Sequence, residues 1–159
     1  MSIKLGYLVL ENFNSYLGKH KILFKEHSGN LVLIKGIDEI DGSSNGSVKS
    51  SIVYALIMAF FGKSIKKELN LDDCINNKSL NPFFRLELGF EDSSDGFIAN
   101  SYVIERIRTK SPASSKCNLF QNNKCISDEF TLTETQNKIE QIIGIDYNMF
   151  MNNNVLNPE

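Results

Sequence analysis

The segment SNGSVKSS, residues 44–51, has the residue types of a phosphate-binding loop. Backbone N–H groups of a tight turn that leads into a helix form a concave, positive site for phosphates. A lysine after the turn can reach the terminal phosphates, and the hydroxyl that follows it can bind Mg²⁺. Lys49 and Ser50 occupy these two positions, so the spacing predicts a phosphate site with a bound cation.

Two positions depart from the usual pattern of such loops. Val48 stands where a glycine directly precedes the lysine, and Ser43 stands where another glycine lies six residues before it. A β-branched residue is poor where φ must be positive, and its side chain can block the close approach of a phosphate. The residues alone therefore leave two alternatives open: a phosphate site, or a Ser/Asn-rich loop that caps a core helix.

The elements around the loop have the order that a phosphate site requires. Residues 30–36, NLVLIKG, are a continuous apolar run that predicts an interior strand. Residues 37–49 are rich in Gly, Ser, Asp and Asn and predict a loop. Residues 50–62 are apolar almost all round and end in Gly62, which predicts a buried helix. The predicted order is strand, loop, buried helix.

Alternation of apolar residues predicts further strands, and a second helix follows them. The strands are expected at residues 4–13, around 22–24, at 83–91 and at 101–109, with a small hairpin about Asn122 and Asn123. The helix is expected over 132–145, with Thr133 and Gln136 as a capping box and Gly144 as its stop. We expect Arg106 and Arg108, on the strand at 101–109, to line a solvated face or a face between two lobes.

The bulk composition is that of one ordinary globular domain. The chain has 159 residues, of which 42% are hydrophobic and 23% charged, and its net charge is −2. This charge excludes a strongly basic nucleic-acid binder that acts through bulk charge alone. No apolar run is long enough for a membrane span, and no secretion signal is recognisable at the start. Three cysteines without metal-type spacing are expected to be reduced in a cytoplasmic protein.

Four separated segments resemble the N-terminal half of the head of SbcC-type ATPases. These are the SMC-like DNA-repair ATPases that partner a nuclease at DNA ends, known also as phage recombination endonuclease subunits. The segments are LVLENFNSY (8–16), LVLIKG (31–36), SNGSVKSSIVYALIMAFFG (44–62) and IGIDYNMFMNNNVL (143–156). Between them, Tyr102 to Arg106 match a Y-x-I-x-R strand of the family. The resemblance covers nearly the whole chain.

The resemblance implies an α/β fold, the N-terminal lobe of an ABC/SMC-type P-loop ATPase head. Its sheet would be mixed around one buried helix, with an antiparallel strand group beside it. ATP and Mg²⁺ are the implied ligands, with Ser50 on the metal. The implied nucleotide-binding residues are Asn14, Ser15, Ser43, Ser44, Asn45, Gly46, Ser47, Val48, Lys49, Ser50 and Ser51. The implied partners are a C-terminal ATPase lobe or a second copy, a nuclease subunit, and DNA reached through the complex, with no membrane.

Three further positions depart from the family pattern. Asn14 stands where a basic residue is usual, residues 36–42 are extra, and Pro158 stands where a magnesium-contacting glutamine is expected. We expect residues 1–159 to form a single N-terminal lobe that lacks the coiled coil and the C-terminal lobe. Phosphoryl transfer needs several groups acting together, so we expect negligible ATP hydrolysis by this chain alone. The alternative function is a non-hydrolysing lobe that acts as an interaction or inhibitory protein.

Two clusters of charged residues have less specific patterns. Lys63, Lys66 and Lys67 could contact DNA phosphates, although a short basic run is more often a solvated surface. Asp72 and Asp73 could bind a metal, but a loop or helix N-terminal role is favoured. No His, Asp and Glu cluster suits the metals of a nuclease, so we expect the nuclease to be a partner.

Overall fold

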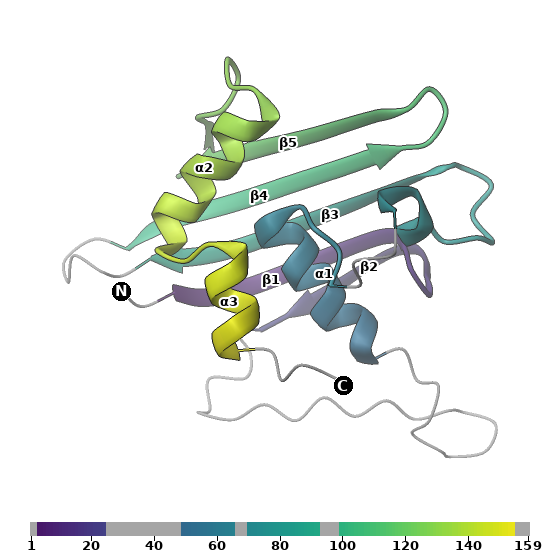
Figure 1. Ribbon diagram of the computed structural model, residues 1–159, viewed down its shortest axis with the longest axis horizontal. Helices are drawn as coiled ribbons and strands as arrows, with labels where there is room; N and C mark the ends of the chain where they lie inside the picture. Colours follow the sequence, from purple (N-terminus) through teal and green to yellow (C-terminus); the bar gives the residue numbers. More distant parts are fainter. Residues whose placement is uncertain (1–2, 25–48, 66–69, 93–98, 155–159) are drawn as a thin grey trace.

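The computed structural model of the protein describes residues 3–24, 49–65, 70–92 and 99–154. Its strands are β1 (Ile3–Phe13), β2 (Tyr16–Leu23), β3 (Phe83–Asp92), β4 (Asn100–Thr109), β5 (Ser114–Gln121) and β6 (Lys124–Cys125). Its helices are α1 (Lys49–Phe61), α2 (Leu132–Ile143) and α3 (Tyr147–Asn154), with a short 3₁₀-helix, η1 (Leu71–Cys74). The strands form one sheet in the order β2-β1-β3-β4-β5-β6, and Figure 1 shows the three α-helices on one face of it.

Every pairing among the described strands is antiparallel, as expected of the antiparallel strand group. The strand predicted at residues 30–36, which would make the sheet mixed, lies outside the described residues. Within the described ranges, no helix is long and apolar enough to cross a membrane. The three cysteines are free.

The first two predicted strands pair with each other as a hairpin, and the second is longer than expected. β2 begins at Tyr16, directly after a turn at Asn14 and Ser15, and pairs with β1 back to Leu23. Among the described strands it lies at the edge of the sheet, and its side chains are mostly exposed. An exposed edge strand needs no apolar alternation, so the pattern from which strands are predicted is missing from its first half.

The small hairpin predicted about Asn122 and Asn123 is confirmed. These two residues join β5 to β6 and have φ angles of 50° and 66°. Two-residue hairpin turns whose central residues both have positive φ match the twist of the flanking strands, and asparagine tolerates this conformation better than most residues.

The core lies between the sheet and the helices. α1 packs across β1, β3 and β4, and α2 packs on β5. On the sheet side, the side chains that are completely buried are Leu8, Leu10, Phe13, Leu86, Leu88, Ile104 and Leu119. α1 contributes Ile52, Ala55, Ile57, Met58, Ala59 and Phe61, so the predicted buried helix is confirmed. Burial of each large apolar side chain stabilises the fold by about 1.5–3 kcal/mol.

The predicted capping box of α2 is wrong by two residues. Thr131 is the N-cap, and its hydroxyl oxygen accepts a hydrogen bond from the Glu134 backbone N–H at 3.3 Å. The Glu134 carboxylate in turn accepts from the Thr131 N–H at 2.8 Å. Thr133 and Gln136 lie inside the helix instead. The predicted stop is confirmed, because Gly144 has a φ of 72° and donates its N–H to the Glu140 carbonyl.

Candidate nucleotide site

The start of α1 presents the two residues that were predicted to contact phosphate and Mg²⁺. Lys49 and Ser50 are the first two residues of α1; Lys49 is half-buried and Ser50 is exposed. The first turn holds no acidic residue, and a helix N-terminus carries a partial positive charge that favours anions. The preceding residues of the predicted loop, Ser43, Ser44, Asn45, Gly46, Ser47 and Val48, lie outside the described residues.

The turn between β1 and β2 is held in place by the segment that follows η1. The Asn14 N–H donates to the Cys74 carbonyl at 2.7 Å, and the Asn14 carbonyl accepts from the Asn76 side-chain amide at 2.7 Å. Phe13 and Ile75 form an isolated antiparallel bridge beside these bonds. Asn14 has a φ of 48°, which asparagine adopts more readily than most residues. The turn therefore has a fixed shape.

Two buried asparagines complete this arrangement, and sequence reasoning missed both. The Asn12 carbonyl accepts from the Asn76 N–H at 2.8 Å, and its side-chain oxygen accepts from the Gly18 N–H at 2.9 Å. Asn12 and Asn76 are only 6% and 5% exposed. Residues 12–14 and 74–76 are about sixty positions apart, and no spacing in the sequence links them. The one local signal is the run of asparagines in each segment, since asparagine favours turns and left-handed backbone.

A groove of about 640 Å³ opens between this turn and the first two turns of α1. It is lined by Asn14, Ser15, Leu17, Ser51, Tyr54, Asp73, Ile75, Asn76, Asn77 and Lys78. The structure thus brings together Asn14, Ser15 and Ser51, three of the predicted site residues from two distant segments. Lys49 and Ser50 directly precede Ser51 but do not line the groove. Its volume lies within the range of small-molecule sites, about 300–1,000 Å³.

The acidic pair beside the groove has the structural role that the sequence favoured. The Asp73 carboxylate accepts from the Asn70 N–H at 2.9 Å and caps η1. The Asp72 carboxylate accepts from Arg108 Nε at 2.7 Å, and this hydrogen bond lowers the pKa of Asp72. In the described part of the chain, no group of three or more His, Cys, Asp or Glu residues could hold a metal ion.

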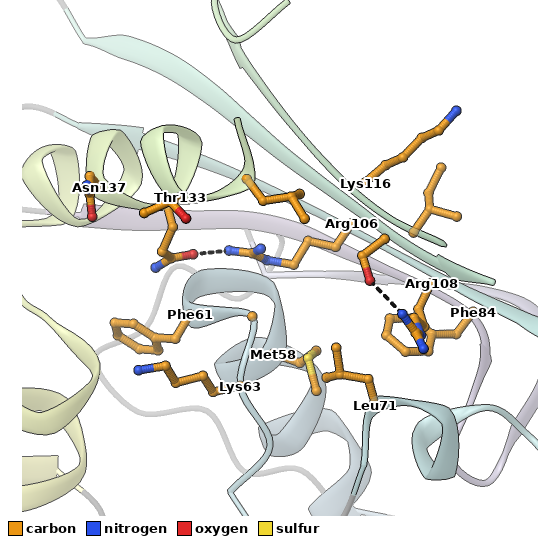
Figure 2. Close-up of a pocket in the computed structure, with 15 residues that line it drawn as sticks. Met58, Phe61, Lys63, Leu71, Phe84, Arg106, Arg108, Lys116, Thr133 and Asn137 are labelled. Carbon is orange, nitrogen blue, oxygen red and sulfur yellow. Dashed lines mark hydrogen bonds between the residues drawn. The ribbon is translucent and has the colours of Figure 1, made fainter. Parts of the chain in front are cut away.

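The other end of α1 is bound by Arg106, so the expectation that this arginine lines a solvated face is wrong, whereas a face between two lobes stays a prediction. Its Nε donates to the Ala59 carbonyl at 2.8 Å, and its Nη2 donates to the Phe60 carbonyl at 3.2 Å and to the Gln136 side-chain oxygen. The Arg106–Gln136 bond joins β4 to α2, and it is the dashed line that ends on Arg106 in Figure 2. The last carbonyls of a helix lack partners within the helix, and a cation there is favoured by the helix dipole.

The pKa of Arg106 is lowered by its burial between β4, α1 and α2. Gly62, which ends α1, has a φ of 65°, and a Cβ at this position would lie 2.8 Å from Arg106 Nη1. A glycine is therefore required here for both the backbone conformation and the close approach of the guanidinium. The predicted helix stop at Gly62 also makes room for Arg106.

A pocket of about 300 Å³ lies beside Arg106 and Arg108, over the apolar side chains of Met58 and Phe84 (Figure 2). Arg108 is engaged there with Asp72 and with the Ser115 hydroxyl, so it also lies on the helix-bearing face and not on the solvated one.

Lys63, the described member of the small basic cluster, lies at the end of α1. Its Nζ lies 4.9 Å from the ring centre of Tyr147, a cation–π contact, and the Tyr147 hydroxyl donates to the Ser64 carbonyl at 3.0 Å. These contacts attach α3 to the end of α1. Lys66 and Lys67 lie outside the described residues.

Comparison with known proteins places the chain in a family of nucleotide-using domains. A family profile described as an AAA domain matches residues 7–159, and the chain belongs to this family. It is 28% identical over 151 residues to a DNA double-strand break repair Rad50 ATPase of Methanosarcina acetivorans, and 31% identical over 152 residues to the protein of that name from Methanocaldococcus jannaschii. The alignments cover 94% and 96% of this chain.

These relatives confirm the resemblance to SbcC-type, SMC-like DNA-repair ATPases that the sequence motifs indicated. The chain spans only 13% of the length of each of them.

Proposed function

We propose that this chain binds ATP with Mg²⁺ as the N-terminal lobe of an SbcC-like ATPase of DNA double-strand-break repair or recombination, and that it acts with a nuclease subunit. The observation that carries the proposal is the groove: Asn14, Ser15 and Ser51 line one depression beside the positive end of α1. A C-terminal ATPase lobe or a second copy would complete the head, and DNA would be reached through the complex.

The residues at the start of α1 fit the two ligands. The Lys49 ammonium and the N–H groups of the first turn, which have no partner within the helix, offer hydrogen-bond donors and positive charge to phosphates. The Ser50 hydroxyl is exposed and is a hard oxygen ligand of the kind Mg²⁺ accepts. Mg²⁺ at nucleotide sites takes few protein ligands and completes its shell with phosphate oxygens and water. Ser50 would be the protein ligand of Mg²⁺ in this site, with phosphate oxygens and water in the other positions.

A second function is favoured by one sequence feature. Val48 replaces the glycine that usually precedes the phosphate-binding lysine, and a valine there opposes close approach of a phosphate. In this alternative the chain does not hydrolyse ATP and acts as an interaction or inhibitory protein on such a complex.

Thermal unfolding of the chain with and without MgATP tests the proposal against this alternative. At a hundredfold excess over Kd, a ligand stabilises a protein by about 2.7 kcal/mol. We expect MgATP to raise the melting temperature of the unmodified chain and to leave that of Lys49→Ala unchanged. Lys124→Ala, on β6 at the far edge of the sheet, is the control and should respond like the unmodified chain. No response of the unmodified chain, or an equal response of Lys49→Ala, would contradict ATP binding at this site.

A further inference from the structure

The groove wall contains one positive side chain. Among the residues that line the groove in the described part of the chain, Lys78 is the single cation and Asp73 the single anion. The Asp73 carboxylate is already engaged with the backbone of η1. Asn14, Ser15 and Ser51 are neutral. The triphosphate of a nucleotide carries several negative charges, so Lys78 on the groove wall and Lys49, at the start of α1 beside the groove, would both attract it.

The backbone that carries Lys78 is fixed to the turn that carries Asn14. The Lys78 N–H donates to the Asn76 side-chain oxygen at 2.9 Å, while the side-chain nitrogen of Asn76 donates to the Asn14 carbonyl at 2.7 Å. One buried amide therefore holds both segments. The backbone of Lys78 is thereby held beside the turn of Asn14 on the groove wall.

The ammonium of Lys78 remains available to a ligand. The side chain is exposed, and no ion pair of Lys78 is formed within residues 3–24, 49–65, 70–92 and 99–154. A lysine is a compact charge on a flexible four-carbon stem, so it can reach into the groove from its rim. Its fixed backbone and free ammonium are the combination that a phosphate-binding lysine requires.

We infer that Lys78 binds a phosphate of the nucleotide in the groove and is a second phosphate-binding lysine beside Lys49. The inference rests on the proposed function, because it names a further residue of the same site. Lys78 comes from the loop after η1, not from the phosphate-binding loop itself. Asn14 is neutral where the SbcC-type ATPases usually have a basic residue. Lys78, on the neighbouring segment of the groove wall, would supply a positive charge in its place.

Titration of the unmodified chain and its variants with MgATP, and separately with adenosine, measures the role of Lys78. A lost hydrogen bond to a charged group corresponds to roughly a tenfold loss of affinity or more, so we expect Lys78→Ala to weaken MgATP binding about tenfold. Lys78→Arg should retain most of the affinity, and Lys78→Glu should lose more than Lys78→Ala. Adenosine should bind Lys78→Ala and the unmodified chain equally, because it has no phosphate. The loss with MgATP should shrink as the salt concentration rises.

The outcomes separate failure of this inference from failure of the proposed function. If the unmodified chain does not bind MgATP, the proposed function fails, and the role of Lys78 fails with it. If the chain binds MgATP in a manner abolished by Lys49→Ala, and Lys78→Ala binds it equally well, the inference alone is overturned. An equal loss with adenosine would also overturn it, since Lys78 would then contact the nucleoside. Lys124→Ala should leave every affinity unchanged.

Discussion

The Nε of Arg106 donates a hydrogen bond to the carbonyl of Ala59 at 2.8 Å, which joins the middle of β4 to the last turn of α1. Ala59 lies ten residues after Lys49 in α1, so this contact is about 15 Å along the helix from Lys49 at a rise of about 1.5 Å per residue. The helix that presents the candidate phosphate-binding residues is therefore anchored at its opposite end. Gln136 of α2 donates to the Phe60 carbonyl at 3.2 Å and completes the anchor.

Replacement of Arg106 by methionine should strongly destabilise the fold. Arg106→Met keeps the length of the side chain but leaves the Ala59 carbonyl and the Gln136 amide oxygen without this donor. Buried acceptors left without partners cost about 1–3 kcal/mol each, so we expect the free energy of unfolding to fall by about 3 kcal/mol. Urea denaturation measures it. Lys116→Met, an exposed position on β5, should change it by less than about 0.5 kcal/mol. Equal values for the two variants would contradict the anchor.

The capping box of α2 gives a prediction with a built-in control. Thr131 accepts the Glu134 N–H and begins the helix, whereas Thr133 is exposed inside the first turn. Thr131→Ala should lower the free energy of unfolding by about 1 kcal/mol, the usual cost of losing an N-cap. Thr133→Ala should be close to neutral. If urea denaturation showed Thr133→Ala to be the more destabilised variant, the capping box would lie at residues 133–136, as the sequence alone suggested.

The sequence predicted the sheet well because alternation is a local pattern. β3 and β4 were predicted to within about one residue, since buried and half-buried side chains alternate along the first half of each strand. The cap of α2 was placed wrongly because two overlapping patterns, at 131–134 and 133–136, satisfy the same rule. The Gln136 side chain is hydrogen-bonded to Arg106 and to the Phe60 carbonyl at the end of α1. It is therefore not available to cap the helix, and the pattern at 131–134 forms instead. That choice is made by tertiary contacts.

The pH dependence of stability at high pH should depend on Tyr7. Burial, together with the hydrogen bond that its hydroxyl donates to Glu87 at 2.8 Å, raises the pKa of Tyr7 to about 12. The folded state therefore holds this proton more tightly than the unfolded state, whose tyrosine pKa is about 10. Its contribution is fully present below pH 10 and is lost as pH rises from about 10 to 12.

Because Tyr7 is partly exposed, solvent screening reduces this contribution to about 1 kcal/mol. Urea denaturation between pH 9 and pH 12 compares the unmodified chain with Tyr7→Phe. We expect the difference in unfolding free energy between the two proteins to narrow by that amount as pH rises. A difference that stays constant across this range would show that the hydroxyl makes no proton-linked contribution.

Spacing in the sequence predicted only those residues of the candidate site that lie next to one another along the chain. Lys49 and Ser50 follow from the spacing of a loop and a helix, and the structure places both at the start of α1. The resemblance to a family added Asn14 and Ser15. Asn76 and Lys78 could not be found in this way, because Asn76 is held by hydrogen bonds to β1 and the β1–β2 turn, and Lys78 is held in turn by Asn76. Such contacts leave no periodicity in the sequence.

Asn76 connects the stability of the fold to the shape of the groove. Its side chain donates to the Asn14 carbonyl and accepts the Lys78 N–H, and the residue is 5% exposed. Asn76→Ala removes both bonds and should lower the free energy of unfolding by about 2 kcal/mol. The β1–β2 turn and the loop that carries Lys78 would no longer be held together. We therefore expect MgATP affinity, measured well below the melting temperature, to fall as well.

Asn77→Ala is the matched control for this pair of effects. Asn77 also lines the groove, but it is exposed, and no hydrogen bond of its side chain is formed with another described residue. Its replacement should change stability by less than about 0.5 kcal/mol. If Asn76→Ala is destabilised but binds MgATP as tightly as the unmodified chain, the hydrogen bonds between Asn14, Asn76 and Lys78 serve the fold alone. Loss of affinity in Asn76→Ala, with Asn77→Ala unchanged in stability, would tie nucleotide binding to the geometry that Asn76 imposes on the groove.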